Sequence, residues 1–155
     1  MNGMNFVEMI VFMGGQGAGK STFFREHFFN THVRVNLDML KTRNRERLLI
    51  AACLQMKQKF VIDNTNPTVA DRKRYFELAQ DSGITVTGYC FDATIEELLQ
   101  RNAQRKGKEC IPAIAVRATF KKFEPPTLAE GFGALFKVRV IADGAFEVTR
   151  MGDEI

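Results

Sequence analysis

The feature that most constrains the fold of this chain is a glycine-rich run at residues 14–21, Gly-Gly-Gln-Gly-Ala-Gly-Lys-Ser. It fits the spacing G-x-x-x-x-G-K-[ST], and the apolar stretch at residues 8–13 before it is typical of a buried strand. Glycine lets the backbone wrap closely around phosphate oxygens, while main-chain N–H groups and the next helix N-terminus form an anion site. The run therefore predicts a strand, a phosphate-binding loop and a helix in direct succession.

The side chains at the end of this run predict a nucleoside triphosphate and a divalent cation. Lys20 can reach the β- and γ-phosphates, and the Ser21 hydroxyl can bind Mg²⁺. We therefore expect ATP and Mg²⁺ as cofactors. The residues expected to bind ATP are Gly15, Gln16, Gly17, Ala18, Gly19, Lys20, Ser21 and Thr22.

Strand and helix patterns alternate along the chain. Stretches rich in Val, Ile and Phe predict strands at residues 8–13, 33–37, 60–62, 84–91 and 136–142. Helical patterns occupy residues 48–56, 68–83, 94–102 and 112–123. This alternation predicts an α/β protein with the P-loop NTPase fold, in which helices flank a parallel five-stranded sheet and a basic lid covers the site. Residues 142–155 are expected to form either a short extra strand or a tail.

Length and cysteine content limit the class of protein. A chain of 155 residues predicts a single domain. Its three cysteines include no C-x-x-C pair, which favours free thiols in a reducing, cytoplasmic setting. The apolar run at residues 9–13 is too short for a signal peptide or a membrane span, so no membrane association is expected.

Four of the fourteen phenylalanines follow the glycine-rich run at helical spacing, Phe23, Phe24, Phe28 and Phe29. Base-stacking platforms are exposed, whereas a set with this spacing more often packs against a sheet. We therefore expect these rings to belong to the core.

Two aspartates follow predicted strands, where ligands bind in open α/β sheets. Asp63 comes directly after the strand at residues 60–62 and is expected to hold Mg²⁺ through a water or to order the γ-phosphate region. Asp38 follows the second strand and can accept the proton of an attacking hydroxyl. The alternatives are an Asx-turn at Asp63 and a helix cap at Asp38.

The formal net charge of +4 conceals two basic segments. Residues 41–47 carry a net charge of +3 and residues 101–108 one of +4, which leaves −3 for the rest of the chain. Arg101 and Arg105 are spaced to share one helix face and lead into a glycine-containing loop that can close as a lid. Arginines delivered in this way stabilise charge on a transferred phosphoryl group. For both segments the alternative is a solvated helix face.

Five segments together resemble the 5′-hydroxyl polynucleotide kinase domain of phage polynucleotide kinase and animal polynucleotide kinase-phosphatase. They are residues 14–22, Val-Asn-Leu-Asp at 35–38, Ile-Asp-Asn-Thr-Asn-Pro at 62–67, the lid at 101–112, and Phe-Glu-Pro-Pro-Thr-Leu-Ala-Glu-Gly-Phe at 123–132. The resemblance spans about residues 8–141, and it implies that residues 1–155 form a single P-loop kinase domain.

The resemblance implies catalytic roles for four residues. Asp38 would be the general base for a DNA or RNA 5′-OH, Lys20 would bind the ATP phosphates, and Arg105 with Arg101 would contact the transferred phosphate. Ser21 and Asp63 would form the site of the Mg²⁺ ion. On the acceptor side we expect Lys41, Arg45 and Asn64 to bind the substrate.

Two positions depart from that family. Family members often have Arg where this chain has Leu37, and the phage enzyme has Arg where it has Lys41, a point charge without a bidentate fork. These departures keep open a kinase for a small-molecule hydroxyl. A nucleotide-dependent nucleic-acid-binding module without transferase activity is a third alternative, because the basic segments alone would allow it.

Overall fold

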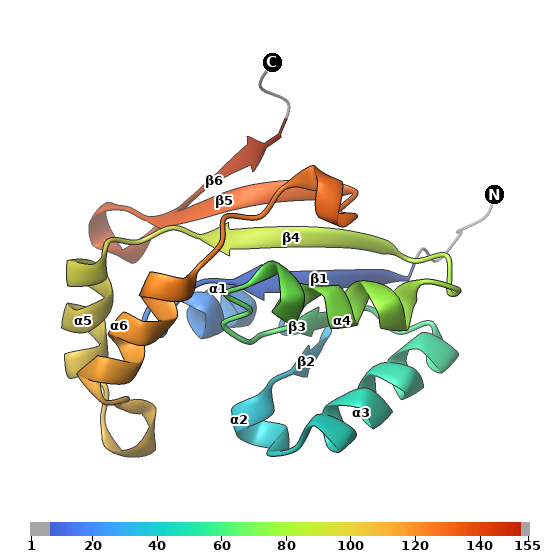
Figure 1. The fold of residues 1–155 in the computed structure, drawn as a ribbon, viewed down its shortest axis with the longest axis horizontal. Coiled ribbons are helices and arrows are strands. Elements are labelled where there is room, and N and C mark those ends of the chain that lie inside the picture. The colour runs from blue at the N-terminus through green and yellow to red at the C-terminus, as the bar shows by residue number, and fades with distance from the viewer. Residues whose placement is uncertain (1–6, 153–155) are drawn as a thin grey trace.

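The computed structural model describes residues 7–152 and contains a six-stranded sheet with the order β2-β3-β1-β4-β5-β6 (Figure 1). Five strands are parallel, and β6 pairs antiparallel with β5. The strands are β1 (Glu8–Met13), β2 (Val33–Val35), β3 (Phe60–Ile62), β4 (Thr85–Phe91), β5 (Ala134–Val140) and β6 (Phe146–Met151).

Six α-helices connect the parallel strands. They are α1 (Lys20–His27), α2 (Leu37–Leu40), α3 (Arg43–Met56), α4 (Val69–Ala79), α5 (Ile95–Ala103) and α6 (Ala113–Lys122). Threonine side chains cap three of them, because Thr42, Thr68 and Thr94 each accept a bond from a backbone N–H in the first turn. Among residues 7–152, no helix combines the length and apolar character needed to cross a membrane.

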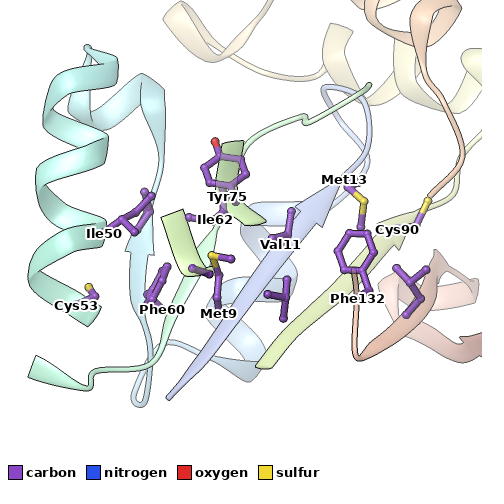
Figure 2. Packing of buried hydrophobic residues seen from close by; sticks show 14 residues of the cluster. Met9, Val11, Met13, Ile50, Cys53, Phe60, Ile62, Tyr75, Cys90 and Phe132 are labelled. Atoms are coloured by element: carbon purple, nitrogen blue, oxygen red, sulfur yellow. The ribbon is translucent and has the colours of Figure 1, made fainter. Parts of the chain in front are cut away.

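The sheet is buried on both faces because β1 alternates its side chains between two apolar clusters. Met9 and Val11 belong to the cluster that α3 and α4 cover (Figure 2), whereas Ile10 and Phe12 belong to the one that α1, α5 and α6 cover. The Phe12 ring lies 6.0 Å from that of Phe23 and 5.0 Å from that of Phe91.

Three of the four predicted core phenylalanines are buried, but the prediction is wrong for Phe29, which is 68% exposed. Helix α1 ends at His27, and Phe28 turns back into the cluster as the residue that follows the helix. Phe29 therefore no longer lies on the sheet-facing side of a helix.

The sheet differs from the predicted one at its end. Residues 142–144 form a tight turn in which Asp143 and Gly144 have φ values of 63° and 74°, and β6 returns along β5 as a sixth strand. The sheet is therefore mixed rather than wholly parallel, and the extra strand forms in place of a tail. Strand β5 lies two residues earlier than predicted, from Ala134 to Val140.

Two other predicted boundaries are wrong. The second strand stops at Val35 instead of residue 37, because the Asn36 side chain accepts a bond from Met39 N–H and starts α2. Helix α4 ends at Ala79, short of the predicted Gly83. The first of these changes matters for the site, because it moves Asp38 from a strand end into the first turn of a helix.

A buried arginine explains the Pro-Pro-Thr-Leu-Ala-Glu-Gly-Phe string at residues 125–132. Arg72 of α4 is fully buried, and its Nε donates to Glu130 Oε1 at 2.8 Å. The same guanidinium donates to the carbonyl oxygens of Asn66 and Glu124, each at 3.0 Å. Asn66 in turn donates to the carbonyl oxygen of Phe12 at the end of β1. The string therefore holds the β3–α4 loop against the central strand.

We expect Arg72→Met to lower the free energy of unfolding by about 3–5 kcal/mol, because it leaves the Glu130 carboxylate buried without its cation. Lys73→Met is the matched control, since Lys73 lies next to it on α4 and makes only an exposed pair with Glu77. That change should cost less than about 1 kcal/mol in urea unfolding. Equal losses in the two variants would contradict the assigned role of the buried pair.

Candidate active site

The loop between β1 and α1 takes a conformation that requires glycine. Gly17 and Gly19 have φ values of 89° and 102°, in the left-handed region. A Cβ on Gly17 would lie 3.0 Å from the Leu98 carbonyl oxygen, so the loop and α5 approach each other as backbone. The first turn of α1 begins directly after Gly19, which aims its unsatisfied N–H groups and the positive end of the helix dipole at the loop.

Lys20 is folded back over this loop. Its Nζ donates to the carbonyl oxygens of Gly14 and Gly15, both at 2.8 Å. Burial lowers the pKa of the Lys20 ammonium to about 8; Asp63 opposes this shift, Arg105 adds to it and Asp38 opposes it. An anion that reaches the loop would therefore meet an incompletely solvated ammonium.

The electrostatic neighbours of Lys20 show which predicted residues the fold brings together. Asp63 follows β3, Asp38 lies in α2, and Arg105 lies in the lid (residues 101–112), yet all three act on the same ammonium group. Figure 1 shows α2 and the loop between α5 and α6 towards the carboxyl ends of the parallel strands. Two carboxylates and a guanidinium from three separate segments thus contribute to the electrostatic environment of Lys20.

Ser21 and Asp63 are adjacent, and an arginine that the sequence analysis missed joins them. Ser21 Oγ donates to Asp63 Oδ2 at 3.3 Å. Arg34 of β2 donates from Nε to the same carboxylate oxygen at 2.8 Å and from Nη2 to Ser21 Oγ at 3.0 Å. Asp63 is 2% exposed at its side chain, so Arg34 supplies the cation that its buried charge needs.

The donor atoms at this place suit Mg²⁺. A hydroxyl and a carboxylate are hard oxygen ligands, and Mg²⁺ typically takes one or two of them together with waters and phosphate oxygens. No cluster of three or more His, Cys, Asp or Glu side chains able to hold a metal occurs within residues 7–152. The Arg34 side chain is 32% exposed, so it has room to move away from Ser21 and Asp63. The residues therefore fit a cation that is held jointly with phosphate.

Asp38 is presented by a short helix whose start is bonded to the segment after β3. Asn36 Nδ2 donates to the Asp63 carbonyl oxygen at 2.7 Å, and Leu37 N–H donates to Asn64 Oδ1 at 2.9 Å. The Asp38 side chain itself is exposed and does not cap the helix; Asn36 does. Position 37, where the sequence departs from the family, thus contributes its backbone to this arrangement.

Asn64 links this helix to a buried polar cluster from α3 and α4. Its Nδ2 donates to Glu46 Oε2 at 3.0 Å and to Tyr75 Oη at 3.2 Å, so its Oδ1 is left to face Leu37 N–H. Tyr75 Oη donates to Glu46 Oε2, and Arg43 Nη1 donates to Glu46 Oε1. Burial and then the Glu46 carboxylate raise the pKa of Tyr75 to about 12, which keeps its hydroxyl a donor. Both ends of the Asn64 amide are therefore used within the protein.

Neither Glu46 nor Tyr75 was predicted. Glu46 is the only acid in a strongly basic segment and looks like part of a solvated face, yet it is 2% exposed. The helical spacing of Tyr75 indicates only that it is a core residue. Its polar role depends on Glu46, which lies 29 residues away in the sequence.

The two predicted basic residues of the acceptor side lie where α2 ends and α3 begins. Lys41 ends this helix with a φ of 75°, and its side chain is exposed. Arg45 is also exposed, and its Nη1 donates to the Leu40 carbonyl oxygen at 3.3 Å. Both therefore border the helix that carries Asp38.

The lid arginines do not share a helix face as predicted, because α5 ends at Ala103 and leaves Arg105 beyond it. Arg101 donates to the Gly17 carbonyl oxygen at 3.3 Å and pairs with Glu97 at 3.0 Å. Arg105 donates only weakly to the Glu109 carbonyl oxygen, at 3.4 Å. Arg101 is thus anchored to the glycine loop, while Arg105 approaches Lys20 from an irregular segment.

Comparison with known proteins gives the family. A sequence profile of the family described as an AAA domain matches residues 9–126, and the chain therefore belongs to this family. It is 31% identical to the bifunctional polynucleotide phosphatase/kinase of Schizosaccharomyces pombe over 129 residues, which are 81% of this chain and 32% of that protein. It is 38% identical over 76 residues to a protein of Acanthamoeba polyphaga mimivirus named as a putative bifunctional polynucleotide phosphatase/kinase. These residues are 48% of this chain and 18% of that protein.

The chain thus spans about a third or less of the length of these curated relatives, which confirm the predicted resemblance. Among solved structures, a gluconokinase from Sinorhizobium meliloti superposes with a TM-score of 0.59 at 19% identity, covering 87% of this chain and 83% of that one. This likeness confirms the P-loop NTPase fold.

The lowered pKa of Lys20 predicts that nucleotide binding takes up a proton. Phosphate oxygens favour the charged ammonium and raise its pKa, so the free protein must gain a proton wherever Lys20 is partly neutral. Calorimetry of Mg·ATP binding in buffers of different ionisation enthalpy should show uptake at about pH 8.5 and little at about pH 6.5, with affinity falling as the pH rises. Arg in place of Lys20 should abolish the uptake. Equal uptake at both pH values would contradict the shift.

The Asn64 contacts predict that this side chain holds the start of α2. Asn64→Ala removes the acceptor of Leu37 N–H, so we expect faster amide hydrogen exchange at Leu37 and a loss of about 1–3 kcal/mol in the free energy of unfolding. Asn30→Ala, in an exposed turn, is the control and should leave both unchanged. Unaltered exchange at Leu37 in the Asn64 variant would show that α2 is held by other contacts.

Proposed function

We propose that the chain is an ATP-dependent polynucleotide kinase that transfers the γ-phosphoryl group of ATP to the 5′-hydroxyl of a DNA or RNA end. The observation that carries this proposal is the pair of residues after β3: the Asp63 side chain accepts a bond from Ser21 of the glycine loop, while the Asp63 carbonyl oxygen and the Asn64 side chain hold the start of the helix that presents Asp38. The candidate base is therefore carried by a helix that is bonded directly to the segment facing the phosphate loop. Phosphoryl transfer needs little more than such positioning and charge.

On the donor side, the loop and first turn at residues 15–22 bind the ATP phosphates. Lys20 turns its ammonium from the Gly14 and Gly15 carbonyl oxygens to the phosphate oxygens. Ser21 and Asp63 would hold Mg²⁺, and Arg34 would then give up its contacts with these two side chains. Bound there, Mg²⁺ would neutralise part of the negative charge that the phosphates bring.

On the acceptor side, Asp38 accepts the proton of the 5′-hydroxyl as its oxygen forms a bond to the γ-phosphorus. The bond from that phosphorus to the bridging oxygen breaks, and ADP leaves with the electron pair. Lys41 and Arg45 lie beside α2 as cations for the acceptor phosphates. We assign Asn64 to holding α2 in place, in addition to any contact with the acceptor, because both of its amide ends are engaged.

The lid arginines act on the transferred group. Burial is the main cause of the lowered pKa of Lys20 and Arg105 adds to it, and we assign Arg105 to the transferred phosphate. Arg101 holds the glycine loop through the Gly17 carbonyl oxygen and can exchange that bond for a phosphate oxygen. The names of the two curated relatives support the polynucleotide substrate, and we propose that the described residues act as a single kinase domain.

Removing the Asp38 carboxylate tests this function. Asp38→Ala should lower kcat for phosphorylation of a 5′-OH oligonucleotide by at least about 100-fold, while Mg·ATP affinity stays within about twofold. Asp81→Ala, an exposed carboxylate beyond α4, is the matched control and should behave like the unaltered protein. Normal transfer by the Asp38 variant would contradict its role as base.

The same assay separates the alternative functions. A kinase for a small hydroxylated molecule would leave the oligonucleotide unlabelled while consuming ATP with that molecule. A binding module without transferase activity would bind the oligonucleotide and release no acceptor-dependent ADP. Either result with the unaltered protein would overturn the proposal.

A further inference from the structure

A basic pocket lies between the first turns of α3 and the second half of α4, next to the buried Glu46–Tyr75 cluster. Its volume is about 500 Å³. We refer to it as the α3–α4 pocket. Its lining residues are Arg43, Asn44, Glu46, Arg47, Arg74, Glu77 and Leu78.

Two of its three arginines lack a carboxylate partner. Arg43 is committed to Glu46 and Tyr75, but Arg47 donates only to the Asn44 side-chain oxygen, and the structure of residues 7–152 gives Arg74 no bond at all. Arg74 Nε is buried and has no hydrogen-bond acceptor. A buried donor left without an acceptor costs free energy, and so points to a missing partner.

The acids of the pocket do not neutralise these two guanidinium groups. Glu46 is buried and its oxygens already accept bonds from Arg43, Asn64 and Tyr75. Glu77 is largely exposed, and its Oε1 lies 3.8 Å from Lys73 Nζ rather than in an ion pair with either arginine. An external anion would supply the carboxylate-like partner that Arg47 and Arg74 lack among the described residues, and the guanidinium fork matches phosphate oxygens in geometry.

The place of the pocket relates it to the acceptor. Helix α3 begins two residues after Lys41 ends α2, the helix that presents Asp38, and Arg45 on the same turn reaches back to Leu40. Figure 1 shows α2 leading directly into the start of α3, below α4. Asp38 and the first turns of α3 that line the pocket thus belong to two consecutive helices.

We propose that the α3–α4 pocket binds a backbone phosphate of the acceptor strand, on the 3′ side of the nucleotide that carries the 5′-hydroxyl. This inference rests on the proposed function and specifies it, because a nucleic acid strand brings a second phosphate to the pocket whereas a small hydroxylated molecule does not. The pocket then contributes to affinity only when the acceptor is long enough to reach it. A nucleoside 3′-phosphate occupies the region of Asp38 alone.

The test measures binding of 5′-OH oligonucleotides of increasing length, labelled at the 3′ end, by fluorescence anisotropy with Mg·ADP present. Affinity for the unaltered protein should rise stepwise at one length. Arg47→Gln and Arg74→Gln should each remove most of that gain, a factor of about five for a partly exposed ionic contact. Each should also reduce the slope of log K against log[salt] by about 0.7. Arg117→Gln, an exposed arginine of α6 outside the pocket, should change neither.

Failure of this inference and failure of the proposed function give different results. Suppose that the protein phosphorylates oligonucleotides and nucleoside 3′-phosphates alike. If its affinity then shows no gain with oligonucleotide length, or if that gain stays intact in both arginine variants, the pocket assignment is overturned. The proposed kinase function is retained in either case. The pocket assignment is also overturned if the arginine variants lose affinity for the nucleoside 3′-phosphate, because the arginines then act through the stability of the fold. Absence of any polynucleotide phosphorylation by the unaltered protein overturns the proposed function itself. Arg47 is exposed, so its variant keeps the test valid if Arg74→Gln fails to fold.

Discussion

The two side chains that follow β3 hold the site together, because they bond in opposite directions. The Asp63 carboxylate reaches the loop side, where Ser21 and Arg34 meet it, and the Asn64 amide reaches α2 and the buried Glu46. Their backbone is fixed by the sheet, since Ile62 pairs with Val11 on one side and with Val35 on the other. The distance between the donor and acceptor sides is therefore set by one strand end, not by flexible loops.

The two cations beside the candidate metal ligands, Lys20 and Arg34, are both bonded within the protein. The Lys20 ammonium is buried and bonded to two carbonyl oxygens, and Arg34 pairs with Asp63 where a metal ion would also find its ligands. Both positive groups have weaker partners than a triphosphate would provide. In the proposed function, binding of Mg·ATP would exchange these internal bonds for external ones, and the proton uptake expected of Lys20 would follow from the same exchange.

Much of this arrangement could be predicted from the sequence, because the informative residues lie within one short motif or directly after predicted strands. The 14–21 run places Lys20 and Ser21, and the strand before Asp63 places that carboxylate at the carboxyl edge. Arg34 could not be predicted, since one arginine between two valines is typical of any half-exposed strand and its partner lies 29 residues away. Helix α2 could not be predicted either. The apolar pattern of the strand continues through Leu37, whereas in the structure the Asn36 side chain caps α2 and so ends the strand. Strand β6 is mostly exposed, so little burial distinguishes the short extra strand from the tail, the two outcomes that the sequence left open for residues 142–155.

The measurement that tests the central claim most directly is a competition for the label of γ-labelled ATP among 5′-OH DNA, 5′-OH RNA and a set of small hydroxylated acceptors. An enzyme whose base and basic helix face a nucleic acid strand should transfer label to a polynucleotide 5′ end with a kcat/KM at least about tenfold above that for any small acceptor. Label found only on a small acceptor, with the polynucleotides unlabelled while ATP is bound, would contradict the account.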